Sequence, residues 1–123
     1  MSAVSAGRLS GRTRHELWLY VVQRGTALVM APLVVVHLAV IVYAVQGGLS
    51  AGEILGRTRG SLLWGAFYGV FVVAASLHAA VGLRNIVSEL TPWRGRSLMW
   101  AATLFAVVLI VLGLRAVAAV VGG

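Results

Sequence analysis

The chain has 123 residues and a mass of 12.9 kDa, a length typical of one domain. Hydrophobic residues make up 60% of the sequence and charged residues only 11%, whereas soluble domains have about 45–50% and about 25%. Too little polar surface is available to cover a water-soluble globule, which excludes a soluble enzyme, a DNA-binding module and a disordered segment. The absence of cysteine excludes disulfides and thiolate-bound metal within this chain. The composition predicts an integral membrane protein.

Residues 1–24 form a polar N-terminal tail, and residues 25–123 are expected to form a membrane domain. An α-helix needs about 20 apolar residues to cross a bilayer. Three stretches reach this length: about 26–46, 62–83 and 98–121. None alternates with the period that marks a membrane β-strand, so the fold class is expected to be all-α, with three transmembrane helices. Residues 46–61 and 84–96 should be the connecting loops, and Pro32 should bend the first helix.

All ten basic residues are arginines, and they divide unevenly between the two sides of a three-span chain. Seven lie in the tail and the second loop: Arg8, Arg12, Arg14, Arg24, Arg84, Arg94 and Arg96. The other three are Arg57, Arg59 and Arg115. Because basic residues collect on the cytoplasmic side, we expect the N-terminus inside and the C-terminus outside. Topology accounts for the basic charge, so no nucleic-acid partner is expected.

Two histidines, His37 and His78, lie within the expected spans, where polar side chains are costly and require an explanation. The simplest is that each histidine hydrogen-bonds a neighbouring helix. For His78 there is a second explanation, because Gly82, Asn85 and Glu89 fall near the same helical face. Gly82 removes a side chain one turn from the imidazole, so a flat tetrapyrrole could approach the backbone. Neutral imidazole is a common axial ligand of haem iron, although ordinary packing of small residues also explains this face.

Arg24 and Arg84 stand at the inner ends of the first two spans. Haem propionates are anionic, and the arginine side chain matches a carboxylate with two parallel hydrogen bonds. These two arginines are therefore candidates for propionate binding. Ordinary anchoring of the spans by cytoplasmic arginines predicts the same positions.

Three stretches together resemble a membrane-anchor (cytochrome b) subunit of the succinate dehydrogenase/fumarate reductase family. The segment from Arg12 to Glu16, followed by the segment from Gln23 to Ala27, is similar to the start of the family's helix I. The segment from His78 to Arg84 resembles the HxxxG motif of helix II, whose histidine ligates haem b. Glu89 stands where the family often has an acidic residue near the quinone site. The similarity covers essentially the whole chain and is greater to the smaller of the two anchor subunits.

Two residues depart from well-known family members. Leu90 follows Glu89 where those members have a quinone-binding tyrosine, so that contact is expected from elsewhere or from the partner subunit. His37 has no counterpart in single-haem members. A histidine at this position resembles the pattern of the di-haem branch, in which helices I and II of each anchor half both offer a histidine.

The resemblance implies half of a haem-binding helical bundle, completed by a second membrane-anchor subunit. It also implies an iron–sulfur subunit and a flavoprotein subunit on the cytoplasmic face of a bacterial or archaeal membrane. Electrons would pass between succinate or fumarate and quinone, and this chain would be a non-catalytic anchor and electron-transfer subunit. The implied haem b ligands are His78 and His37, with propionates at Arg24 and Arg84 and quinone near Arg24 and Glu89. Two haems are expected, and one if only His78 ligates.

Helix rise places the two imidazoles at different depths. His37 lies thirteen residues beyond Arg24, about 20 Å from the inner boundary, whereas His78 lies six residues from Arg84, about 9 Å from it. A difference of roughly 10 Å prevents one iron from taking both, because a metal–imidazole bond is only about 2 Å long. Each haem would then need its other ligand from the partner anchor. The alternative for His37 is a hydrogen bond to a carbonyl, such as one freed by Pro32.

A haem-free structural subunit of another membrane complex is the alternative function. In that case both histidines would be packing residues. A small transporter fits less well, because transporters usually have broken helices and polar groups along a path.

Overall fold

The computed structural model describes the backbone of residues 3–122 and the side chains of residues 14–122. Within this range the chain forms four α-helices and no strand: α1 Ala3–Gln46, α2 Ala51–Thr58, α3 Leu62–Leu90 and α4 Arg96–Val121. Three of them are long and apolar enough to cross a membrane, namely α3, α4 and the Arg14–Gln46 part of α1. The expected all-α membrane fold with three spanning helices is confirmed.

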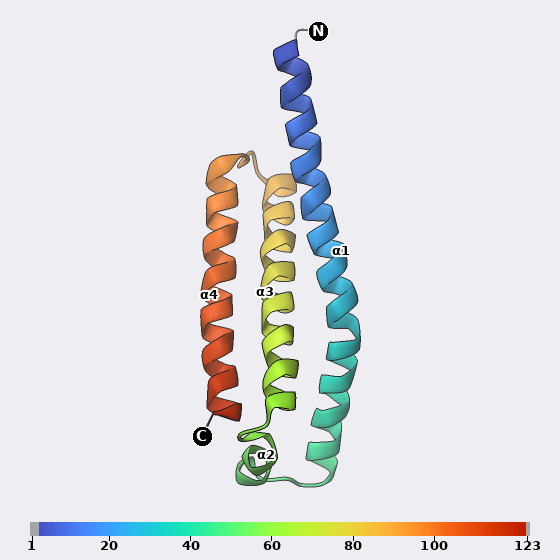
Figure 1. The fold of residues 1–123 in the computed structure, drawn as a ribbon, viewed down its shortest axis with the longest axis vertical. Coiled ribbons are helices and arrows are strands. Elements are labelled where there is room, and N and C mark those ends of the chain that lie inside the picture. The colour runs from blue at the N-terminus through green and yellow to red at the C-terminus, as the bar shows by residue number, and fades with distance from the viewer. Residues whose placement is uncertain (1–2, 123) are drawn as a thin grey trace.

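Helix α3 is the central helix of the fold. It packs against α1 on one side and α4 on the other, and successive long helices run antiparallel (Figure 1). Its buried residues are small or medium-sized: Ala74, Ser76, Ala80 and Val81. Small residues let helix backbones approach closely, which is how helices associate in a membrane. The outer faces of α1 and α4 remain apolar and exposed, as lipid or another membrane subunit requires.

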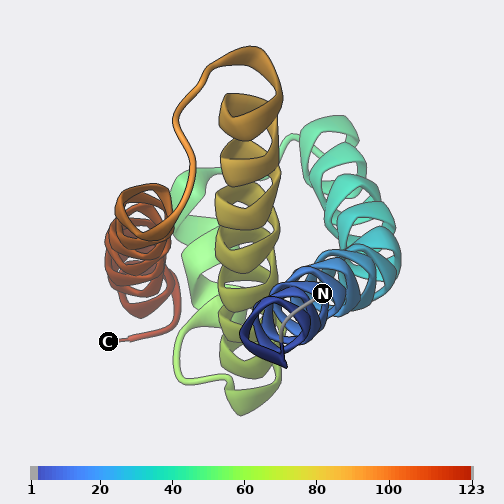
Figure 2. The same ribbon diagram turned by 90° about the horizontal axis from the view of Figure 1, so that it is seen from above.

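The N-terminal tail is part of α1, which is one continuous helix from Ala3 onward. Its first turns extend beyond the ends of the other two long helices (Figure 1). Pro32 lies inside α1 and cannot donate a hydrogen bond to the carbonyl of Leu28, four residues earlier. Figure 2 shows that α1 changes direction along its length, and an internal proline is a known cause of such bending.

The second connection is shorter than expected, because α3 continues to Leu90 rather than ending at residue 83. The last two turns of α3, residues 84–90, carry several polar side chains, but their residue types are compatible with a helix. The helix ends at Leu90. The next residue, Thr91, is extended (φ −131°, ψ 162°), because Pro92 disfavours the helical conformation in the residue before it. Gly95 then adopts a φ of +89°, a conformation that glycine accepts readily, and α4 begins at Arg96.

The first connection contains a helix that the expected loop did not include. Helix α2 begins with a capping box in which the Ser50 hydroxyl accepts from the Glu53 amide and the Glu53 carboxylate accepts from the Ser50 amide. Hydrogen bonds join the C-terminal end of α2 to the C-terminal end of α4. The buried Thr58 hydroxyl donates to the Val120 carbonyl at 2.8 Å, and the Gly60 amide donates to the Val121 carbonyl at 2.7 Å.

Candidate functional site

His78 lies where α3 meets α1, and it contacts the α1 residue Thr26. The Nδ1 atom of His78 is 3.2 Å from the Thr26 hydroxyl oxygen. His78 is half-buried, and its Nε2 atom makes no hydrogen bond with the described residues. The imidazole is therefore held through one nitrogen while the other remains available.

Gln23, which was not among the predicted site residues, also faces α3 here, one turn before Thr26. A Cβ atom added at Gly82 would stand 3.4 Å from the Gln23 side-chain nitrogen, so the two helices are close at this level. The Gln23 Oε1 atom is buried and has no hydrogen-bond partner among the described residues. The three-residue spacing from Thr26 was the available signal, because such residues share one helical face.

An apolar groove of about 400 Å³ lies between α1 and α3 beside the His78–Thr26 pair. Its lining is Gly25, Thr26, Val29, Gly69, Val70, Val73, Ala74 and Leu77. A Cβ atom added at Gly25 or Gly69 would meet nothing within 4 Å, so the groove is open at both glycines. A flat apolar group could therefore lie against the backbone here, on the turns of α3 that precede His78, whereas the space predicted beside Gly82 is occupied by the Gln23 side chain.

His37 lies farther along α1, among aromatic side chains of α3. Its ring meets Tyr68 edge-on, with centroids 5.9 Å apart, and Phe71 at 5.6 Å in a tilted arrangement. The two aromatic residues precede His78 by ten and seven residues, which places the histidines about 10–15 Å apart along the helix axis. The His37 Nδ1 atom is buried and has no hydrogen-bond partner among the described residues. The carbonyl hydrogen bond considered for His37 is therefore not made through Nδ1.

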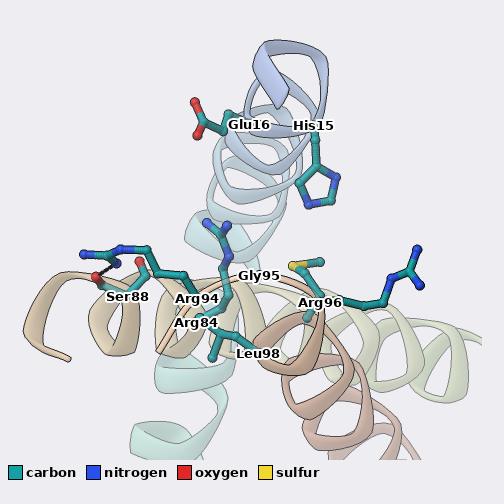
Figure 3. A pocket seen from close by; sticks show the side chains of 9 residues that line it. His15, Glu16, Arg84, Ser88, Arg94, Gly95, Arg96 and Leu98 are labelled. Carbon is teal, nitrogen blue, oxygen red and sulfur yellow. Dashed lines mark hydrogen bonds between the residues drawn. The ribbon is translucent and has the colours of Figure 1, made fainter. Parts of the chain in front are cut away.

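A cleft of about 940 Å³ opens at the end of the bundle where α3 and α4 are joined (Figure 3). It is lined by His15, Glu16, Arg84, Ser88, Arg94, Gly95, Arg96, Leu98 and Met99. The Arg84 guanidinium points from α3 towards α1, between His15 and Glu16, while Arg94 and Arg96 extend away in opposite directions (Figure 3). Arg84 donates to the Asn85 side-chain oxygen at 3.1 Å, and its buried Nε atom has no partner among the described residues.

The other two predicted site residues, Arg24 and Glu89, are exposed. The Arg24 guanidinium lies over the Tyr20 ring, 5.4 Å from its centroid. Neither residue lines the cleft that contains Arg84. The structure thus brings His78 together with Thr26, and leaves Arg24 and Glu89 on the outer surface of this chain.

The side chains present fit a haem better than a bare metal ion. In the part of the chain that the structure describes, no cluster of three or more His, Cys, Asp or Glu side chains could hold a metal. Haem iron takes its equatorial ligands from the macrocycle, so a single well-placed imidazole from this chain is sufficient. His78, with one nitrogen hydrogen-bonded and an apolar groove beside it, fits that requirement.

No curated protein and no solved structure matched the chain. A family model described as the succinate dehydrogenase/fumarate reductase transmembrane subunit matches residues 2–113. This match includes every candidate site residue and the whole of α1 and α3, and it extends to Gly113 in α4. The chain therefore belongs to the succinate dehydrogenase/fumarate reductase transmembrane subunit family.

Proposed function

We propose that this transmembrane subunit binds haem b through the Nε2 atom of His78 and transfers electrons between succinate or fumarate chemistry and membrane quinone. The observation that carries the proposal is the 3.2 Å contact between His78 Nδ1 and Thr26. A metal-ligating histidine almost always hydrogen-bonds through its other ring nitrogen. The groove beside this pair further supports a flat group that lies close to the backbone.

When bound, haem accepts and releases single electrons, and its axial ligand and surroundings set the potential. The residues of this chain hold and orient the group. His78 would supply an imidazole nitrogen to the iron, and Gly25 and Gly69 leave the groove beside it open. Arg84 offers a propionate carboxylate a guanidinium whose Nε atom is unpaired within the described chain. Arg24 is the second proposed propionate partner, although it faces outward here.

The proposed assembly contains a second membrane-anchor subunit, an iron–sulfur subunit and a flavoprotein subunit. The dicarboxylate chemistry takes place in the last two, and this chain, proposed to be the smaller anchor, contributes no catalytic residue. Quinone is proposed to bind near Arg24 and Glu89 at the inner boundary, where donors would stabilise charge that develops on a carbonyl oxygen. Both side chains are exposed, so a neighbouring subunit could cover them.

His37 is proposed as the axial ligand of a second haem, as in the di-haem branch of the family. The separation of about 10–15 Å from His78 along the helix axis means that one iron could not bind both imidazoles. His37 also lacks an Nδ1 partner within the described chain, so no internal hydrogen bond at that atom explains its presence in the membrane. A haem assay of the purified complex should give two haems b, and His37→Ala should remove one redox transition.

The proposed orientation places the N-terminus in the cytoplasm of a bacterium or archaeon. The cleft at that end contains Arg84, Arg94 and Arg96, which agrees with the arginine distribution that favours a cytoplasmic location. The α2–α4 junction lies at the opposite end of the bundle (Figure 1), which this orientation would place on the outer side of the membrane.

The visible spectrum of the purified complex tests the haem proposal. We expect reduced b-type bands in the unaltered complex and the loss of one b-type component in His78→Ala. Copurification of the other subunits shows whether the variant has assembled. An assembled His78→Ala complex with an unchanged haem-to-protein ratio would refute the assignment. Absence of haem from the unaltered complex would support the alternative, a structural subunit in which Thr26 simply satisfies a packing histidine.

A further inference from the structure

The Thr26 hydroxyl has three polar neighbours but only one proton. Its oxygen is 2.7 Å from the Val22 carbonyl, 3.1 Å from the Gln23 carbonyl and 3.2 Å from His78 Nδ1. A hydroxyl can donate once and accept twice. Both carbonyls can only accept, so the way in which the proton is shared determines the protonation of Nδ1.

The distances assign the hydroxyl proton to α1. The Val22 contact, at 2.7 Å, is the shortest of the three and has the usual length of a full O–H···O bond. The His78 contact, at 3.2 Å, falls at the long end of the N–H···O range. With its proton directed to the carbonyls, the Thr26 oxygen presents a lone pair to Nδ1. His78 therefore carries its proton on Nδ1 and donates it, which leaves the Nε2 lone pair free.

We propose that Thr26 is a positioning residue that fixes the tautomer and ring orientation of His78 and so presents Nε2 to haem iron. This inference rests on the proposed function, because it assigns a role towards the haem. Helix α1 supplies the orienting oxygen and α3 the imidazole, so the ligand is prepared by the packing of two helices before any haem binds. This arrangement avoids the cost of ordering the ring when the iron binds.

His37 gives an internal comparison. Its Nδ1 atom has no hydrogen-bond partner among the described residues, and its ring is positioned by Tyr68 and Phe71. Loss of the Thr26 hydroxyl should therefore affect the His78 site and not the His37 site. The two imidazoles should respond differently to changes at residue 26.

The test uses the whole purified complex with three single substitutions. Thr26→Val keeps the side-chain shape but removes the acceptor, and Thr26→Ser restores a hydroxyl. Thr103→Val is the matched control, because the Thr103 hydroxyl donates only to its own helix, to the Met99 carbonyl at 2.8 Å. The readouts are haem content, the midpoint potential and the EPR signals of the low-spin ferric haem.

Thr26→Val should weaken the preference of the site for ferric over ferrous haem, because a histidine that has lost its hydrogen-bond acceptor is less basic. Loss of such a partner typically costs 10–100-fold in metal affinity. A tenfold loss confined to the ferric state corresponds to a rise of about 59 mV in the potential of the His78 haem. The EPR signal of that haem should shift, Thr26→Ser should restore both properties, and Thr103→Val should change neither.

An assembled Thr26→Val complex with the wild-type potential and EPR signal would overturn the role of Thr26. If that variant does not assemble, Thr26→Ala removes the hydroxyl without adding volume and is read in the same way. If neither assembles, nitrogen NMR of histidine-labelled, reduced wild-type complex decides. A hydrogen-bonded proton on His78 Nδ1 supports the inference, and an Nδ1 without a proton overturns it. Failure of the haem proposal is distinguished by His78→Ala, which would then leave the spectrum unchanged.

Discussion

Gly113 of α4 marks a close approach between α3 and α4, and Gly113→Ala should destabilise the bundle there. A Cβ atom added at Gly113 would overlap Val72 Cγ1, and it would stand 3.1 Å from Cγ2 and 3.3 Å from Cβ of the same residue. The obstacle includes the branch point of the valine, whose χ1 angle has one strongly preferred rotamer in a helix. The valine cannot easily turn aside, so the helices must separate.

The expected magnitude follows from two opposing effects. Adding a methyl group to a closely packed site costs about 1–3 kcal/mol. Replacing glycine by alanine in a helix contributes about 0.8–1.0 kcal/mol in the opposite direction. The net destabilisation should be up to about 2 kcal/mol. The spectrum of the proposed haem should not change, because His78 is hydrogen-bonded to α1 rather than to α4.

Thermal inactivation of the detergent-solubilised complex measures this effect. Gly56→Ala in α2 is the matched control, since an added Cβ there meets nothing within 4 Å and Gly56 lies outside the proposed site, and it should be neutral or slightly stabilising. Val72→Ala combined with Gly113→Ala should recover much of the lost stability, because the obstructing methyl groups are gone. Equal stability of the two glycine variants, or no recovery in the double variant, would refute the packing argument.

Three other predictions concern the end of the bundle that contains α2. Thr58→Val should lower stability by about 1 kcal/mol in the same thermal assay, because the bond to the Val120 carbonyl is lost, and Thr58→Ser should not. The bonds from the Ser50 amide and hydroxyl lower the pKa of Glu53, so the cap should persist at neutral pH and weaken only as acid protonates this carboxylate; a Glu53→Gln variant should lack that acid transition in a pH series of circular dichroism. In intact cells an impermeant thiol reagent should label Ala51→Cys and not Ser5→Cys; the reverse pattern would overturn the proposed orientation.

The number and order of the spanning helices could be predicted from the sequence, because about 20 apolar residues suffice to identify a crossing. The ends of the helices could not. Hydropathy falls at Arg84, yet the backbone remains helical until Pro92 disfavours the helical conformation at Thr91. The capping box that starts α2 was present as Ser50 and Glu53, but the apolar pattern alone did not reveal it.

At the candidate site, the sequence predicted the relations between residues of one helix but not the contacts between two helices. His78 and Gly82 are one turn apart on α3, so their relation follows from helical spacing alone. The face of α1 that meets them depends on tertiary packing. Thr26 and Gln23 lie on that face, whereas Arg24, although next to Gln23 in the sequence, is exposed.

The site at His78 also indicates what the rest of the assembly must supply. The other membrane-depth imidazole, His37, lies about 10–15 Å away along the helix axis, beyond the reach of an iron bound to His78. The groove beside Thr26 is open at Gly25 and Gly69, so a flat group held there keeps one face uncovered by this chain. If haem b has two axial ligands here, His37 is too far away to be the second, and an imidazole of another subunit is the proposed donor. The exposed apolar faces of the long helices give a second anchor subunit the surface from which to provide it.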